Sequence, residues 1–324
     1  MTSHLAQRST VMGRPRFEGS NICTWIGFKH VMYLVEEAVL DHLRQIGHVP
    51  RELYEEYGLG VEIVDSDARI LSAIHMDDPV TTDVIPVANH DHEMEFRVES
   101  FVDRSGSGGD ERTKAVVAKV RVVLRRTANA GPGPADLEPY AVAQLDRAAR
   151  AGPNATVATS NGRGTVGLSD DLPPVAAGAN QVVWRWRIPY FYCHYSDRLQ
   201  HSGYLRVLEE VVDVFLAERG ISIRTMLDER QWIPVVPRAR VNILREAYME
   251  EELHTVFAVT EVFKDLTYTA SMNCYVRRAG RFVHTATGTI THGYAVIVDR
   301  RNWTLVPFDE PTLAALRGRS DLRV

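Results

Sequence analysis

The sequence predicts an α+β protein built from two similar domains. Two observations indicate this: the chain resembles itself at a constant offset, and each copy has one helix-like stretch followed by four strand-like stretches. A chain of 324 residues with 45% hydrophobic composition can bury two cores of ordinary domain size.

The internal repeat is visible without any gap over a long stretch of each copy. A constant shift aligns residues 31–82 with residues 204–255, and eleven of the aligned pairs are identical. The identical pairs include Glu36-Glu37 with Glu209-Glu210, Gly47 with Gly220, and Met76 with Met249. A constant register across several elements predicts two copies of one fold.

Each copy contains one stretch with apolar residues at helical spacing. This stretch runs from Val31 to Leu43 in the first copy, and Gly47 follows it as a C-terminal stop. The second runs from Leu205 to Leu216, and Ser202 is well placed to cap its N-terminus. We expect each helix to bury its apolar stripe against the concave face of a curled antiparallel sheet.

The strand-like stretches follow each helix, and each copy also opens with a strand. Alternating or continuous apolar residues predict strands at 59–74, 80–88, 93–103 and 114–125, and at 232–245, 255–263, 267–277 and 282–298. These stretches place an N-terminal domain at residues 1–127 and a C-terminal domain at residues 181–324. Residues 128–180 are rich in Ala, Gly, Pro and Asn and predict a linker, with one short helix over 137–150.

Composition excludes several classes of protein. A net charge of −5 gives no reason to expect a nucleic-acid partner. No apolar run reaches the roughly 18 residues that a membrane span needs, and the N-terminus lacks an apolar signal core. Cys23, Cys193 and Cys274 form no disulfide framework and no metal-ligand pattern. We therefore expect a cytoplasmic location and no metal site.

The segments that enter the two helices carry a motif. In the second copy it runs from Tyr195-Ser196-Asp197 through His201-Ser202-Gly203 to Glu209-Glu210, and in the first from Asn21 through His30 to Glu36-Glu37-Ala38. This motif resembles that of hotdog-fold thioesterases of the 4-hydroxybenzoyl-CoA and acyl carrier protein types. The segment 284–292 also resembles the final strand of this group. The resemblance implies a double hotdog in which each sheet wraps one central helix.

The resemblance also implies a function and a partner. It predicts a thioesterase that hydrolyses acyl-CoA or acyl-carrier-protein thioesters in polyketide, secondary or fatty-acyl metabolism. The substrate would carry its own coenzyme A or phosphopantetheine, so no cofactor is expected. Single-domain members pair into dimers, so the duplicated chain would form a pseudo-dimer with a slot for pantetheine between its helices; association of further copies stays open.

Two positions depart from the motif. Anchored on the Glu-Glu pairs, the catalytic Asp of the family falls on Asn21 in the first copy and on His194, which we expect on the preceding strand, in the second. Some polyketide-associated hotdog thioesterases also carry Asn there. An Asn amide could hold a carbonyl or a water, but it cannot act as a base.

The remaining candidates surround the start of each helix. Backbone N–H groups there would stabilise the oxyanion of a thioester under attack. Asp197 and His201 could orient a water and move its proton, which makes them catalytic candidates beside Asn21 and His194. The expected substrate-binding residues are Trp25, Gly27, Phe28, His30, Glu36, Ser202, Gly203, Tyr204 and Glu209.

Two other kinds of function stay open. Asn21 and the Asp197/His201 pair also permit a non-hydrolytic enzyme on the same fold, such as a dehydratase, decarboxylase, acyltransferase or cyclase. A non-catalytic acyl-binding protein would need none of these side chains for chemistry. The sequence does not indicate which half is active.

Overall fold

The structure is a computed structural model that describes residues 4–87, 92–103, 112–150, 175, 180–300 and 302–318. The chain divides into two compact units. The first is Met1–Leu145 with Pro237–Arg240, and the second is Asp146–Val236 with Val241–Val324. Residues 128–145, which the sequence assigned to a linker, therefore belong to the first unit.

The first unit has one long helix against a five-stranded antiparallel sheet of order β1-β3-β4-β5-β2. Its helices and strands are β1 (Ser9–Gly13), α1 (Phe28–Gln45), α2 (Pro50–Tyr57), β2 (Leu59–Ile70), β3 (Val80–Pro86), β4 (Met94–Asp103), β5 (Arg112–Arg126) and β6 (Ala141–Val142). Short 3-10 turns occur at His4–Ala6, Phe17–Gly19 and Glu138–Tyr140. The short strand β6 pairs in parallel with β5.

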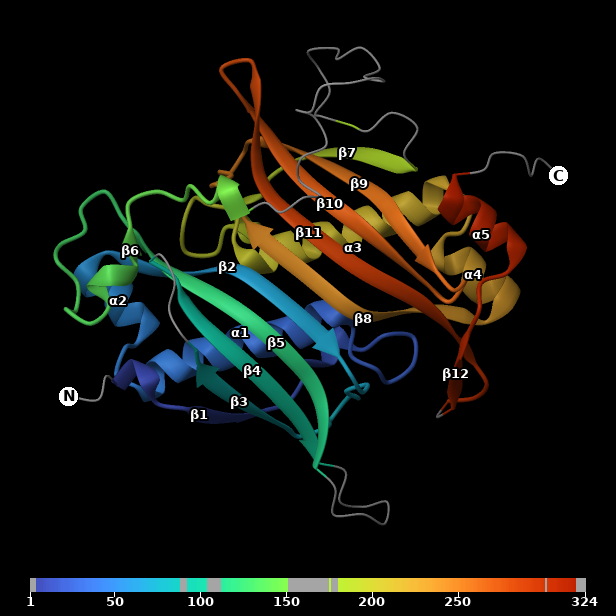
Figure 1. The fold of residues 1–324 in the computed structure, drawn as a ribbon, viewed down its shortest axis with the longest axis horizontal. Coiled ribbons are helices and arrows are strands. Elements are labelled where there is room, and N and C mark those ends of the chain that lie inside the picture. The colour runs from blue at the N-terminus through green and yellow to red at the C-terminus, as the bar shows by residue number, and fades with distance from the viewer. Residues whose placement is uncertain are drawn as a thin grey trace. The chain divides into compact units, whose positions relative to one another are not determined.

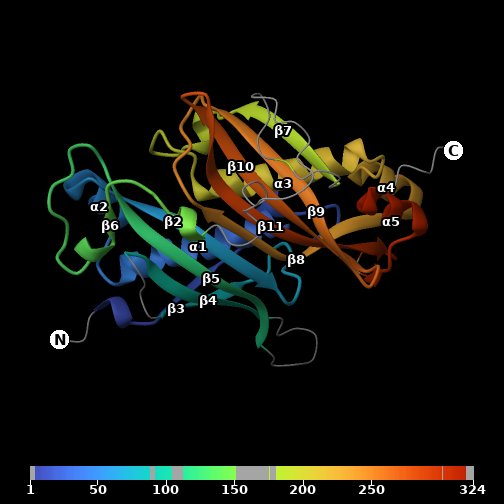
Figure 2. The ribbon, with the colours of Figure 1, turned by 45° about the horizontal axis from the view of Figure 1, so that its top comes forward.

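The second unit repeats this plan with the strand order β8-β11-β10-β9-β7. Its elements are β7 (Gln181–Arg187), α3 (His201–Glu218), α4 (Ile223–Arg230), β8 (Trp232–Ile243), β9 (Glu252–Phe263), β10 (Thr267–Arg278), β11 (Arg281–Ile297), β12 (Trp303–Val306) and α5 (Glu310–Arg317). Two 3-10 turns, Ala148–Arg150 and η6 (Tyr190–Tyr192), precede α3. In Figures 1 and 2, α1 lies behind β4 and β5 of the first unit, and α3 lies behind β9, β10 and β11 of the second unit.

The predicted repeat is confirmed element by element. The helices α1 and α3, the helices α2 and α4, and the strands β2 and β8 begin and end at positions related by the shift that the sequence shows. Backbone contacts repeat as well, because Ile26 N donates to Ile74 O and Leu199 N donates to Ala247 O, both at 2.8 Å. The α+β class and the order of one long helix before four long strands are therefore as the sequence predicted.

Each long helix buries the stripe that its sequence pattern indicated. In α1, Val31, Val35 and Val39 are at most 2% exposed, and in α3 Leu208 and Phe215 are fully buried. Burying one such side chain contributes about 1.5–3 kcal/mol, so this apolar stripe is a main source of stability for both helices. Gly47 and Gly220 follow the helices with φ of 91° and 71°, as predicted for C-terminal stops.

The expected helix over 137–150 is wrong. The structure has two 3-10 turns and the short strand β6 in this segment. Pro139 cannot donate an N–H group inside a helix, and an isolated helix of this length is marginal in water. Leu137 and Leu145 are nevertheless buried, at 0% and 3% exposure. The apolar spacing therefore correctly indicated that Leu137 and Leu145 are buried, but it did not indicate a helix.

The core of the second unit contains polar aromatic side chains. Tyr268 of β10 and His292 of β11 stack with ring centroids 5.2 Å apart, and Tyr294 is 1% exposed. Neither ring nitrogen of His292 has a hydrogen-bond partner among the described residues. Burial lowers the pKa of His292 to about 3, so the ring is neutral in the folded protein near pH 7.

This histidine makes the second unit sensitive to acid. The unfolded chain binds its proton near pH 6.5 and the folded chain only near pH 3, so the unfolded state binds more protons between these values. The free energy of unfolding should then fall with pH by about 1.4 kcal/mol per pH unit for this one group. His292→Phe keeps the stacked ring and should give a shallower dependence between pH 6.5 and 4.5, measured by chemical denaturation. Equal slopes for the two proteins would contradict the assignment.

Candidate functional site

The loops before α1 and α3 are the candidate site, and they are built alike. Gly27 N donates to Gly19 O at 2.9 Å, and Gln200 N donates to Tyr192 O at 3.1 Å, at positions related by the same shift. Single β-bridges tie Trp25 to His75 and Arg198 to Tyr248. Each residue of one loop can therefore be compared with its counterpart in the other.

The first turns of α1 and α3 receive no hydrogen bond from an N-cap side chain. Their N-cap residues are Gly27 and Gln200. By contrast, α4 and α5 are capped by Ser222 and Asp309, whose side chains accept from backbone N–H groups at 3.1 and 3.0 Å. The N-cap residue of α2, Val49, makes no side-chain bond either, so a missing cap does not by itself mark a site. At the two central helices it leaves the positive helix end to other partners, as an oxyanion site requires.

The role expected for Ser202 as a helix cap is wrong. Ser202 is the second residue of α3, and it is 5% exposed. Its Oγ makes a short hydrogen bond with Nε2 of His194. The helix begins two residues earlier than a cap at Ser202 would place it, because the backbone bond from Gln200 to Tyr192 fixes the end of the loop.

The expectation that His194 lies on the strand before α3 is wrong. Strand β7 ends at Arg187, and the turn η6 follows Pro189, which cannot donate to a strand ladder. His194 is an exposed turn residue with φ of 50°, and its ring reaches the first turn of α3 through Ser202.

Asn21 occupies the same position in the first unit. It is also exposed, and its backbone N donates to Trp25 O at 2.7 Å. Its Oδ1 lies 3.2 Å from the point where a Cβ on Gly27 would stand, so the side chain lies against the N-cap of α1. The structure therefore brings Asn21 and His194 to equivalent places beside the two helix N-termini.

A reciprocal exchange of large and small residues packs these loops. In the first unit, a Cβ on Gly19 would lie 2.6 Å from Cγ of the buried His30. In the second unit the counterparts are Tyr192 and Gly203, and a Cβ on Gly203 would lie 2.9 Å from Tyr192 O. Gly203 therefore allows close packing of the helix on the loop, and His30 fills the space that Gly19 leaves.

Several other candidates are core residues. Trp25 and Phe28 are 5% and 6% exposed, and Tyr204 is fully buried. His201 stands at the position of Phe28 and is 4% exposed, so both units place an aromatic ring there. Packing accounts for these positions, and their role in binding substrate stays a prediction.

Asp197 and His201 have opposite surroundings. The carboxylate of Asp197 is 70% exposed and lies 3.7 Å from Nη1 of Arg198, while His201 is buried. The backbone oxygen of Asp197 accepts from Met249 N at 2.7 Å, as that of Thr24 does from Met76 N. Asp197 thus fills a turn position that is Thr in the other copy, and this geometry does not favour the expected water-orienting pair.

The helix glutamates divide into inner and outer members. Glu36 and Glu209 are half-buried, whereas Glu37 and Glu210 are exposed. Glu210 accepts a hydrogen bond from the Tyr192 hydroxyl at 2.8 Å, which fastens the loop to α3. Sequence reasoning missed this bond and the bond between His194 and Ser202, because both join residues that only the loop fold brings together.

Comparison with known proteins gives the fold and not a sequence relative. No family model matches the chain, and no curated protein matches it by sequence. A structure from Lactobacillus plantarum assigned as an oleoyl thioesterase superposes with a TM-score of 0.59 at 11% identity, over 89% of this chain and 96% of the other.

Two further structures cover as much of the chain. The 12:0-acyl-carrier-protein thioesterase from Umbellularia californica gives a TM-score of 0.58 at 11% identity, over 90% of this chain and 99% of the other. An acyl-carrier-protein thioesterase from Bacteroides thetaiotaomicron gives 0.54 at 10% identity, over 90% and 100%. The chain therefore has the double hotdog fold, which it shares with acyl thioesterases over most of its length. Within the described residues no helix is long and apolar enough to cross a bilayer.

The reciprocal packing predicts an energetic coupling between Gly19 and His30. Gly19→Ala alone should destabilise the first unit by about 1–3 kcal/mol, because its methyl group overlaps a buried ring. In the double variant with His30→Ala the overlap is gone, so the two effects should not add. Denaturation of both single variants and the double variant measures the coupling. Gly13→Ala is the control, since nothing lies within 4 Å of that position; additive effects would contradict the packing.

Proposed function

We propose that the protein hydrolyses acyl thioesters and that the second unit provides the base. The proposal is carried by the imidazole of His194, which is hydrogen-bonded to the first turn of a helix that has no side-chain cap. The shared fold of three acyl thioesterases supports it. Asn21 holds the same position in the first unit but cannot take up a proton.

The proposed reaction uses the His194 ring and the first turn of α3. His194 accepts a proton from a water as the water oxygen attacks the thioester carbonyl carbon. Backbone N–H groups at the start of α3 stabilise the negative oxygen of the tetrahedral intermediate. The carbon–sulfur bond then breaks, and the imidazolium returns the proton to the leaving thiolate. Ser202 holds the ring at the helix, so it is a positioning residue.

The first unit has a different role in this proposal. The amide of Asn21 lies beside the N-cap of α1, where it can donate to a carbonyl oxygen or hold a water. The two helix starts are therefore chemically unequal, with hydrolysis assigned to the second. The substrate class is an acyl chain on coenzyme A or on a carrier protein; its polyketide, secondary or fatty-acyl origin is a prediction from the sequence resemblance alone.

The test is thiol release from a panel of acyl-CoA and acyl-carrier-protein thioesters. His194→Gln keeps a hydrogen bond to Ser202 but removes the base, so kcat should fall by about 10²–10⁴-fold. Ser202→Ala should lower kcat less and shift the pH dependence of kcat, because the ring loses its anchor. Asn21→Ala should mainly raise KM.

The control is Arg224→Gln, on the exposed side of α4, which should leave kcat and KM unchanged. No thiol release with any chain length would contradict the proposed hydrolysis. Mass spectrometry of the carrier-bound chain distinguishes the non-hydrolytic alternative, in which the acyl group changes while the thioester persists or moves to another acceptor. A wild-type rate from His194→Gln would contradict the assignment of the base.

A further inference from the structure

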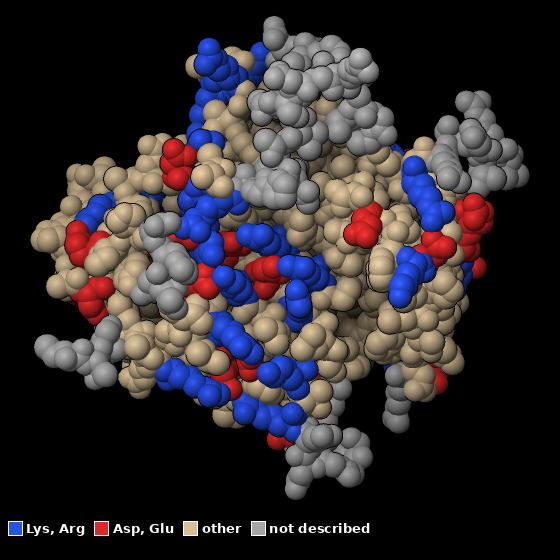
Figure 3. Space-filling view, in the orientation of Figure 1, with Lys and Arg blue, Asp and Glu red and all other residues tan. Residues whose placement is uncertain are grey.

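One face of the first unit carries two layers of charge. Figure 3 shows Lys and Arg side chains gathered over this sheet, with acidic groups visible between them. The carboxylates belong to β2, β3, β4 and the residue before β4: Asp65, Asp67, Asp83, Glu93, Glu95 and Glu99. The cations paired with them include Arg97, Arg112, Lys114, Lys119, Arg238 and Arg240. We call this set the charged face.

The charged face is the side of the sheet that turns away from α1. Phe96 packs edge-on against His42 of α1, with ring centroids 5.1 Å apart. Its neighbours Glu95 and Arg97 must therefore point to the opposite side, because side chains alternate along a strand. These groups therefore lie on the solvent side of the sheet and not in the core.

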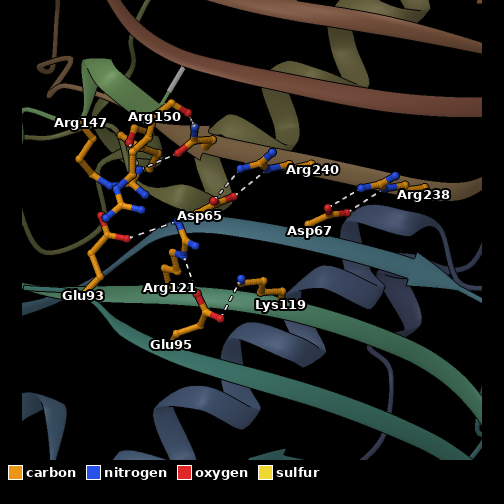
Figure 4. Close-up of polar contacts among 12 residues, drawn as sticks. Asp65, Asp67, Glu93, Glu95, Lys119, Arg121, Arg147, Arg150, Arg238 and Arg240 are labelled. Carbon is orange, nitrogen blue, oxygen red and sulfur yellow. Dashed lines mark hydrogen bonds and ion pairs between the residues drawn. The ribbon is translucent and has the colours of Figure 1, made fainter. Parts of the chain in front are cut away.

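The two layers differ in exposure. The six carboxylate side chains are 3–24% exposed, whereas the six cations named above are 39–56% exposed. Arg121, which pairs with Glu93 and Glu95, is 17% exposed and belongs to the lower layer. Asp65 and Asp67 each accept two hydrogen bonds from one guanidinium, at 2.6–2.9 Å (Figure 4). A molecule that approaches this face meets cations that are already held in place from below.

Three of the carboxylates, Glu99, Glu95 and Asp83, have a lowered pKa, which favours their charged form. Hydrogen bonds from Lys114 and Arg97 lower the pKa of Glu99. Burial raises the pKa of Glu95 and Asp83, but their bonds to basic groups outweigh it and the net direction is downward. The lower layer therefore keeps the cations in register at neutral pH, so docking costs little side-chain entropy.

The second unit shows that the fold does not require these charges. A β-bulge at the same place in each sheet identifies equivalent positions. Counted five residues back from the bulge, Glu95 lies opposite Arg121 in the first unit, and Thr269 lies opposite Thr291 in the second. One copy thus has an ion pair at 2.8 Å where the other has two hydroxyl groups at 3.1 Å.

The next pair along the strands repeats the contrast. Arg97 lies opposite Lys119 in the first unit, and Ser271 lies opposite Thr289 at the same place in the second. The same pairing of strands therefore accepts uncharged residues. Since the whole chain carries a charge of −5, a concentration of exposed cations on one face is a local property.

One end of the charged face lies at the candidate site of its own unit. Strand β2 ends at Ile70, which pairs with Val116 near the start of β5. The loop after β2 is bridged to the entry loop of α1 through His75 and Trp25. Arg112 and Lys114 lie at this same end of the sheet, so a partner docked there would be next to the entry loop of α1. This loop holds Asn21, which the proposed function assigns to substrate binding and not to proton transfer.

We propose that the charged face is the docking surface for an acidic carrier protein that delivers the thioester. This rests on the proposed function and selects the carrier-bound form of the substrate over coenzyme A. The face spans β3, β4, β5, β2 and the segment Pro237–Arg240, a width of about 20 Å at roughly 4.8 Å per strand. Such a width suits a protein surface better than one nucleotide, and guanidinium groups that already hold one carboxylate have further N–H donors for a second.

The test neutralises two exposed cations that lie opposite each other on β4 and β5. Arg97→Gln/Lys119→Gln should lower kcat/KM for an acyl-carrier-protein thioester about tenfold, mainly through KM. Hydrolysis of the same acyl group on coenzyme A should stay within twofold, which also reports intact folding. Raising the salt concentration should lower kcat/KM for the carrier substrate of the wild-type protein and have less effect on the variant.

The matched control is Arg51→Gln/Arg224→Gln, which removes the same charge from exposed helix positions and should leave both substrates unaffected. Equal losses with both substrates, or no loss with the carrier substrate, would overturn the docking surface. If the wild-type protein hydrolyses neither thioester, the proposed function fails but the surface is still tested. Fluorescence anisotropy of a labelled acyl carrier protein should then show salt-sensitive binding that the Arg97/Lys119 variant weakens, and equal binding by both proteins would overturn it.

Discussion

Each half of this chain depends on one contact, the burial of a long amphipathic helix against a curled sheet. The helix can sit there only if the segment leading into it turns sharply at the end of the sheet. Backbone bonds such as Ile26 to Ile74, and Leu199 to Ala247, make that turn in both units. The core therefore fixes the positions of the N-terminal ends of α1 and α3. A side chain on the loop beside either end is positioned by the same packing.

The sequence predicted the helices and strands whose apolar residues recur at regular spacing along the chain. Apolar spacing located both long helices, alternation located the eight long strands, and the constant offset between the copies predicted their equivalence. The α2 and α4 helices were missed, although Pro50 at the start of α2 and Gly58 after it, with φ of 66°, are ordinary boundary signals. The ion pairs of the charged face also left a signal, since Glu93, Glu95, Arg97 and Glu99 alternate with apolar residues.

The candidate site was less predictable because it lies in loops. Alignment on the Glu-Glu pairs correctly made Asn21 and His194 equivalent, but it could not give the turn that brings His194 to Ser202. That turn depends on Pro189, on the 3-10 turn at Tyr190–Tyr192, and on a left-handed backbone at His194. None of these has a period along the chain, so a pattern search gives no information about where the ring points.

The exchange of bulk between loop and helix has a consequence for how the two halves can change. Gly19 and His30 in one copy correspond to Tyr192 and Gly203 in the other, so each copy keeps one large and one small partner. A genetic crossover falling between the paired positions would join two bulky groups in one product and two glycines in the other, crowding one core and leaving a void in its sibling. The two halves therefore cannot exchange short segments of sequence at this place without a loss of stability.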